Sequence, residues 1–134
     1  MLFLSTSVFA DPSGVLYNYP ITRVIDGDTV AFKAEFLPSP LKSELALRIY
    51  GVDTPEKGAK AKCALEAEKG KQATQFTTQM IASAQHRQIM LMGWDKYGGR
   101  VLGDVILDGK SLRGLLIQRG LARPYFGEAK KSWC

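Results

Sequence analysis

One long helical pattern, from about residue 64 to 84, interrupts a chain that otherwise shows only short strand patterns. Strand patterns are expected before it at 21–25, 29–36 and 41–50, and after it at 88–92 and 100–107. A short helix is expected to begin at Ser111 and to end at Gly120. Because strands and helices do not alternate, the pattern disfavours a doubly wound parallel sheet.

The periodicity of these segments indicates which side chains are buried. Apolar residues alternate along 29–36, and Leu45, Leu47 and Ile49 share one face of the following strand. Arg48 has the opposite parity and is therefore expected on the other face. This order of elements matches the partly open, five-stranded Greek-key barrel called the OB-fold. We expect an α+β fold, with the long helix between the third and fourth strands and the short helix near the C-terminus.

The long helix has one apolar face and one polar face. The apolar positions are Ala73, Phe76, Thr77, Met80, Ile81 and Ala84. The remaining face carries Glu66, Lys69, Lys71, Gln75 and Gln79. These polar side chains are expected to be solvated.

The size and charge of the chain narrow the class of partner. With 134 residues, of which 46% are hydrophobic, one globular domain is expected. The net charge is +5 and the pI is about 9.3. A basic surface favours a polyanion such as nucleic acid, or an anionic membrane.

The first ten residues are uncharged and largely apolar, and they end in Val8-Phe9-Ala10, which fits an export cleavage site. They are too short to span a bilayer. We interpret residues 1–10 as a signal-peptide remnant, the alternative being a disordered or packed N-terminal arm. The mature protein is accordingly expected to be secreted or periplasmic, with no membrane anchor.

The chain has two cysteines, Cys63 and Cys134. An even count behind an export-like N-terminus suggests one disulfide, the alternative being two free thiols. The bond would close a loop of about 72 residues and stabilise the fold by about 4 kcal/mol. A zinc site is disfavoured, since the only histidine, His86, has no partner ligand.

Two acidic turns carry the most informative chemistry. Asp26-Gly27-Asp28 ends the first strand, and Asp53-Thr54-Pro55-Glu56 ends the third. If these strands are neighbours, up to four carboxylates meet at one rim, where they would repel one another. A calcium-like ion, which prefers oxygen ligands, would relieve that repulsion. The alternative for the first turn is that Asp-Gly is simply a turn sequence.

Arginine and aromatic residues flank the same loops. Arg48 and Arg100 suit a phosphate, which guanidinium groups bind bidentately, although each is alternatively a surface ion-pair partner. Glu56 is placed to hold or deprotonate an attacking water. Tyr97 and Tyr125 would stack on a base or bind a phosphate, unless they serve packing. Lys57, Lys60 and Lys62 would attract a polyanion or simply aid solubility.

Four blocks in order resemble the staphylococcal-nuclease-like (thermonuclease) family, an OB-fold with added helices. They are Val24-Ile25-Asp26-Gly27-Asp28-Thr29-Val30, 47–56, Asp95-Lys96-Tyr97-Gly98-Gly99-Arg100 and Gly120-Leu121-Ala122. The resemblance covers about residues 21–126, is closest to exported bacterial members, and leaves 127–134 as a C-terminal tail. It implies a Ca²⁺-dependent phosphodiesterase that cuts DNA and RNA and leaves 3′-phosphate ends.

The resemblance also assigns roles to particular residues. Asp28, Asp53 and the Thr54 carbonyl resemble the direct calcium ligands, and Asp26 resembles a nearby acid that supports them. Glu56 resembles the residue that activates water. Arg48 and Arg100 resemble the pair that neutralises the phosphate in the transition state. Lys96, Tyr97 and Tyr125 are similar to substrate-binding residues, with Tyr125 as the base-stacking one.

Three features depart from the family pattern. The chain reads Tyr-Gly-Gly-Arg where the founding pattern reads Tyr-Gly-Arg, so Arg100 keeps its direction only if Gly98-Gly99 form a bulge. The family's long C-terminal helix is missing from this sequence, and a Cys63–Cys134 disulfide is expected to replace its stabilising role. The basic segment after Glu56 is short, which would alter substrate preference.

The sequence therefore predicts a monomeric nuclease with DNA and RNA as substrates and no stable protein partner. A non-catalytic OB-fold module that binds nucleic acid is the alternative. A third interpretation is an extracellular interaction domain whose acidic rim binds calcium structurally.

Overall fold

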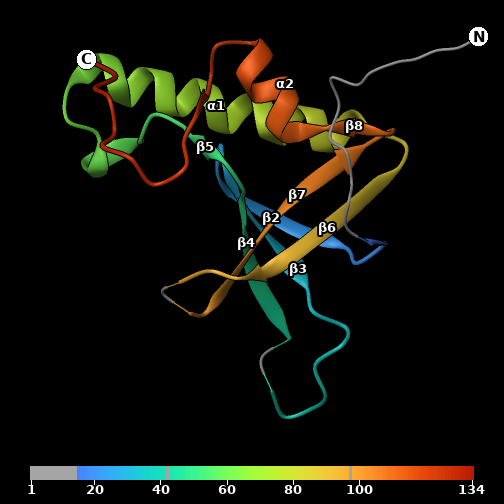
Figure 1. The fold of residues 1–134 in the computed structure, drawn as a ribbon. Helices are drawn as coiled ribbons and strands as arrows, with labels where there is room; N and C mark the ends of the chain where they lie inside the picture. The colour runs from blue at the N-terminus through green and yellow to red at the C-terminus, as the bar shows by residue number, and fades with distance from the viewer. Residues whose placement is uncertain (1–14, 42, 97) are drawn as a thin grey trace, which may run out of the picture.

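The computed structural model describes residues 15–41, 43–96 and 98–134. The strands are β1 (Leu16–Tyr17), β2 (Ile21–Asp26), β3 (Thr29–Lys33), β4 (Glu44–Ile49), β5 (Val52–Asp53), β6 (Arg87–Trp94), β7 (Arg100–Leu107), β8 (Lys110–Ser111) and β9 (Arg123–Pro124). The helices are a 3₁₀ turn, η1 (Gly58–Lys60), and the α-helices α1 (Ala64–Ser83) and α2 (Leu112–Gln118). Figure 1 shows α1 lying across one end of the twisted sheet, with α2 beside it. Within the described residues, neither helix is long and apolar enough to cross a membrane.

The main sheet is mostly antiparallel. Its strand order is β1-β6-β7-β4-β3-β2, β8 pairs with β7, and β5 and β9 form a separate two-stranded sheet. The pairing of β4 with β7 is the parallel one. In the described part of the chain these pairings run from β1 to β2 without closing, so the structure shows a mixed α/β fold with an open sheet and does not confirm the expected five-stranded barrel.

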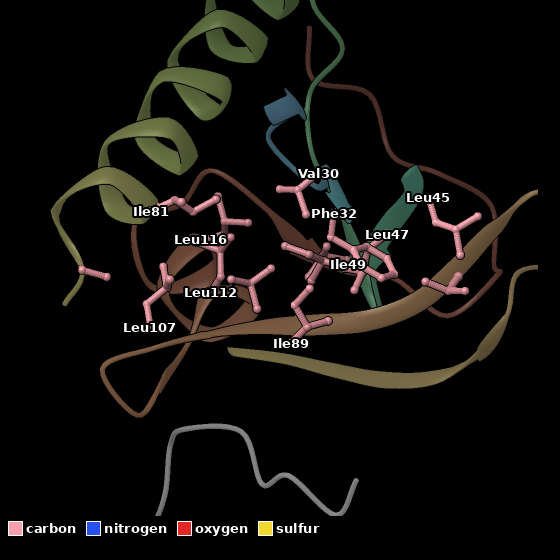
Figure 2. Close-up of a cluster of buried hydrophobic side chains, with 14 of the residues drawn as sticks. Val30, Phe32, Leu45, Leu47, Ile49, Ile81, Ile89, Leu107, Leu112 and Leu116 are labelled. Carbon is pink, nitrogen blue, oxygen red and sulfur yellow. The ribbon is translucent and has the colours of Figure 1, made fainter. Parts of the chain in front are cut away.

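The buried core explains why these segments take these forms. Leu45, Leu47 and Ile49 are buried on one side of β4, as their alternation predicts, and Phe32 and Val30 of β3 pack with them. Figure 2 shows the core side chains of the strands, α1 and α2 directed toward a common interior. Arg48 lies on the opposite side of β4 and is only partly buried.

Several element boundaries differ from the sequence prediction. The segment predicted over 29–36 ends at Lys33, and the one predicted over 41–50 begins at Glu44. Pro38 and Pro40 lie between them, and proline donates no backbone hydrogen bond to a sheet. Strand β6 is longer than the predicted 88–92, since it spans Arg87–Trp94.

Helix α1 is fixed over the first acidic turn by a close backbone approach. The hydroxyl of Thr77 donates to the carbonyl of Gly27 at 2.7 Å. A Cβ at Gly27 would lie 2.7 Å from the Cβ of Ala73, closer than side-chain atoms normally approach. Glycine is therefore required in the Asp26-Gly27-Asp28 turn because α1 packs directly against it.

The predicted disulfide between Cys63 and Cys134 is present, with the two Cα atoms 6.2 Å apart. It joins the last residue to the N-cap of α1, and Figure 1 shows the C-terminus beside the start of that helix.

We expect the double variant Cys63→Ser/Cys134→Ser to lose about 4 kcal/mol of unfolding free energy, because the bond closes a long loop in the unfolded chain. The sequence separation of the two cysteines is 71 residues. Denaturant unfolding of the oxidised protein and the variant measures this difference. Equal midpoints and slopes for the two proteins would show that the crosslink adds no stability.

Candidate active site

The turn between β2 and β3 and the turn after β4 are joined by one arginine. Thr29 pairs with Arg48 across β3 and β4, which brings Asp28 next to the guanidinium. Nη2 of Arg48 lies 3.6 Å from Oδ2 of Asp28 and donates to the carbonyl of Val52 at 3.2 Å. Arg48 thus contacts the first acidic turn and the strand that leads into the second.

Arg100 lies on the same face of the sheet as Arg48. In the parallel pairing of β4 with β7, Ala46 is opposite Arg100 and Arg48 is opposite Leu102, so residues of equal parity share a face. Gly98 and Gly99 have φ of 73° and 75°, a left-handed conformation that glycine adopts without strain. These two glycines turn the chain ahead of β7, and Arg100 begins that strand on the face that carries Arg48.

Asp95 is the anion that Arg100 engages in this structure. Nε of Arg100 donates to Oδ2 of Asp95, a buried carboxylate. Burial raises the pKa of Asp95, but the hydrogen bond and charge of Arg100, together with the charge of Arg48, outweigh it and hold that pKa below its usual value. Both arginines therefore act on the same small region, and an anion already occupies part of it.

Asp53 is almost fully buried, and both of its oxygens have partners. Nε1 of Trp133 donates to Oδ2 at 3.1 Å, and Nζ of Lys130 lies 3.3 Å from Oδ1. Both partners come from the C-terminal tail, whose end is fixed by the disulfide to Cys63.

The remaining carboxylates of the two turns repel one another. Burial raises the pKa of Glu56, and the negative charges of Asp28 and Asp26 raise it further. Burial, followed by the charge of Asp28, likewise raises the pKa of Asp26, although Lys57 lies 3.8 Å away. The three side chains are thus close enough for their charges to interact, and the carboxyl of Glu56 is poised to accept a proton nearer to neutral pH than usual.

Glu66 fixes the backbone of the second turn. Its oxygens accept from the backbone N–H of Glu56 at 3.0 Å and of Lys62 at 2.9 Å. Both hydrogen bonds lower the pKa of Glu66, and the one from Glu56 has the larger effect. The prediction that Glu66 belongs to a solvated face was wrong, because the side chain turns back from the first turn of α1 and is 5% exposed.

The predicted substrate-binding residues are less closely grouped. The backbone N–H of Lys96 donates to Oδ1 of Asp95 at 2.8 Å, which places Lys96 beside the Arg100 partner. Tyr125 donates from its backbone N–H to the carbonyl of Gly51 at 2.9 Å, and it lines a cavity of about 330 Å³ with Asp53. Tyr97 lies outside the described residues.

The predicted calcium site depends on oxygen donors of the two acidic turns. Among the described residues, no group of three or more His, Cys, Asp or Glu side chains is placed to hold a metal ion. The predicted set needs only two carboxylates, Asp28 and Asp53, and a carbonyl. These are oxygen donors of the kind calcium prefers, and the repulsion at Asp26 and Glu56 together with the ammonium on Asp53 shows a region that attracts a cation. In donor type these residues suit calcium, but within the described ranges they do not form a ready-made cluster of metal ligands.

Fold and site together define a mixed α/β protein in which Arg48 and Arg100 share one face of the sheet beside the acidic turns. The family model described as staphylococcal nuclease homologue matches residues 46–132, well over half of the chain. The protein therefore belongs to the staphylococcal nuclease family, a family of nucleases. The matched range includes Arg48, Glu56 and Arg100, whereas the Asp26-Gly27-Asp28 turn precedes it.

Sequence reasoning missed four residues that shape this site: Glu66, Asp95, Lys130 and Trp133. Lys130 and Trp133 had a signal in the sequence. Trp133 precedes Cys134, and the predicted disulfide to Cys63 already placed the tail near the second acidic turn. Glu66 had none, since its position on α1 is polar by periodicity.

Proposed function

We propose that the protein is a calcium-dependent nuclease that hydrolyses phosphodiester bonds of DNA and RNA and leaves 3′-phosphate ends, on an OB-type fold. The observation that carries this proposal is the position of Arg48, which contacts the first acidic turn and the approach to the second while Arg100 lies on the same sheet face. Family membership supports it.

Asp28, Asp53 and the carbonyl of Thr54 would hold the calcium ion, with Asp26 in support. When bound, calcium supplies positive charge to the phosphate oxygens and lowers the energy of the charge that develops there. Asp53 must then exchange its contact with Lys130 for the ion.

Each remaining role in the hydrolysis is assigned to a side chain of this protein. Glu56 orients a water and accepts its proton as the water oxygen bonds to phosphorus. Arg48 and Arg100 neutralise the extra negative charge on the phosphate oxygens. The bond from phosphorus to the 5′ oxygen breaks, and that oxygen takes a proton from solvent water and leaves as a hydroxyl. Glu56 then releases its proton to solvent, which restores the carboxylate. Lys96, Tyr97 and Tyr125 bind the adjoining nucleotide.

Removal of calcium is expected to abolish cleavage. Plasmid DNA, single-stranded DNA and RNA are incubated with the protein in millimolar calcium, with a chelator, and with calcium restored. We expect cleavage in the first and third conditions and background in the second, because the carboxylates alone repel the phosphate. Cleavage that persists at full rate in the chelator would contradict the calcium assignment.

A non-catalytic nucleic-acid-binding module is the second candidate. It is favoured by the net charge of +5 and by the internal pairing of Asp53 with Lys130 and of Arg100 with Asp95. Such a module would bind DNA in a salt-dependent manner and cleave nothing under any divalent ion. A domain that uses calcium only structurally would gain stability from the ion without cleaving.

We further propose that the protein acts outside the cytoplasm as a monomer, with residues 21–126 as its catalytic domain. The Cys63–Cys134 disulfide supports this location, because such bonds persist in oxidising compartments. Alkylation of free thiols in protein isolated from its native compartment, with and without prior reduction, tests it.

A further inference from the structure

The segment after β9 forms a wall of the candidate site although it has no helix or strand of its own. It is fixed at its end by the Cys63–Cys134 bond and by Trp133, which is 8% exposed. The guanidinium of Arg123 lies 3.8 Å from the Trp133 ring centroid, a stacking distance. The position of the tail is therefore specified by a covalent bond and a buried aromatic contact.

The anchored tail places Lys130 beside Asp53. Nζ of Lys130 lies 3.3 Å from Oδ1 of Asp53 and 5.4 Å from the Tyr125 ring centroid. A pocket of about 310 Å³ contains Lys130, Asp53, Thr54, Glu56 and Glu66 together, so the ammonium lies among the carboxylates of the second turn. Its positive charge also partly offsets the influences that raise the pKa of Glu56.

We propose that Lys130 is a tethered cation that occupies Asp53 when no metal is bound, and that a divalent ion enters the site by displacing it. The inference rests on the proposed function, since it treats Asp53 as a metal ligand. An ammonium group and a calcium ion compete for the same carboxylate oxygen, so the contact lowers calcium affinity. The Trp133 hydrogen bond goes to the other oxygen, Oδ2, and leaves Oδ1 as the atom that is exchanged.

The size of the effect follows from the exposure of the two partners. The Lys130 side chain is 49% exposed and that of Asp53 is 9% exposed. Water can therefore solvate the ammonium once it is released, so the ion pair contributes only a modest free energy. We expect Lys130→Met to tighten calcium binding by about threefold to tenfold, since an ion pair with one half-exposed partner contributes only modestly.

Lys131 provides a matched control. It is the next residue, it lines the same pocket, and the substitution Lys131→Met removes the same charge. Its contacts differ: its backbone carbonyl accepts from Nη1 of Arg123 at 3.1 Å, and its ammonium acts on exposed Glu128. A general effect of net charge would change both variants equally, whereas displacement from Asp53 would change Lys130→Met alone.

The experiment is isothermal calorimetry with calcium chloride as titrant and no nucleic acid present. It uses the oxidised full chain, Lys130→Met and Lys131→Met, after thermal unfolding has shown that all three are folded. Tighter binding in Lys130→Met, by threefold or more beyond Lys131→Met, is the expected result. Equal affinities in the two variants, or weaker binding in Lys130→Met, would overturn the proposal and leave the proposed function standing.

A failure of the calcium assignment gives a different pattern. If the unaltered protein shows no heat of binding while Lys130→Met binds calcium, Lys130 blocks Asp53 and the inference holds in a stronger form. If no variant binds calcium, both the inference and the calcium part of the proposed function are overturned.

Discussion

Replacement of Glu56 by glutamine is expected to lower the rate of phosphodiester hydrolysis by about 10²–10⁴-fold, the usual contribution of a positioned general base. The amide keeps the size of the side chain and a hydrogen-bonding oxygen, but it accepts no proton from the attacking water. The backbone of this turn is held by Glu66 through the N–H of Glu56, so the substitution should leave the local fold unchanged. Initial rates on a labelled oligonucleotide at saturating calcium measure the loss.

Glu68→Gln is the matched control for this loss. Glu68 is an exposed carboxylate on α1 whose side chain accepts a hydrogen bond from Gln72 at 3.4 Å. The same change of charge there should leave the rate within about twofold, since surface substitutions away from the site have small effects. A Glu56→Gln variant as fast as Glu68→Gln would remove Glu56 from the mechanism.

Replacement of Arg48 by lysine is expected to lower the rate by about 10²–10³-fold, the loss typical of one removed transition-state donor. Lysine keeps the charge but lacks the planar fork that contacts a phosphate at two points. Nη2 of Arg48 is also the atom that lies near Asp28 and Val52, so the shorter reach of a single ammonium would loosen the link between the two turns. The rate constant at saturating substrate should account for most of the loss.

Arg23→Lys serves as the control for Arg48. Arg23 lies on β2, which is separated from β4 by β3, and its guanidinium contacts the partly exposed Glu44 at 3.2 Å, so it is an arginine of the same sheet with a surface role. Its substitution should leave the rate unchanged within about twofold. If the two variants cleave equally fast, Arg48 does not stabilise the transition state.

Local sequence patterns predicted the strands and helices because each pattern depends only on residues close together in the chain. The alternation of Leu45, Leu47 and Ile49 placed Arg48 on the opposite face, and the structure confirms that placement. The helical period of 64–84 predicted α1, which ends one residue earlier. The disulfide was predicted from the number of cysteines together with the export-like start of the chain.

Contacts across the fold were beyond the reach of such patterns. Glu66 looks solvated by periodicity, yet it is buried because two backbone N–H groups of the preceding loop need an acceptor. Nothing local to Lys130 predicts its contact with Asp53, since that contact depends on the path of an irregular tail fixed at Cys134. The direction of Arg100 likewise depended on how Gly98 and Gly99 would absorb one extra residue.

Identification of the products of a labelled oligonucleotide tests the central claim most directly, because it separates a nuclease from a binding module and shows which bond breaks. The oxidised protein is incubated with the oligonucleotide in calcium, and the fragment ends are examined before and after phosphatase treatment. We expect shortened fragments that carry 3′-phosphate groups, formed by the unaltered protein and strongly reduced with Glu56→Gln. An oligonucleotide that is bound but remains intact, or fragments that carry 5′-phosphate groups, would contradict the central claim.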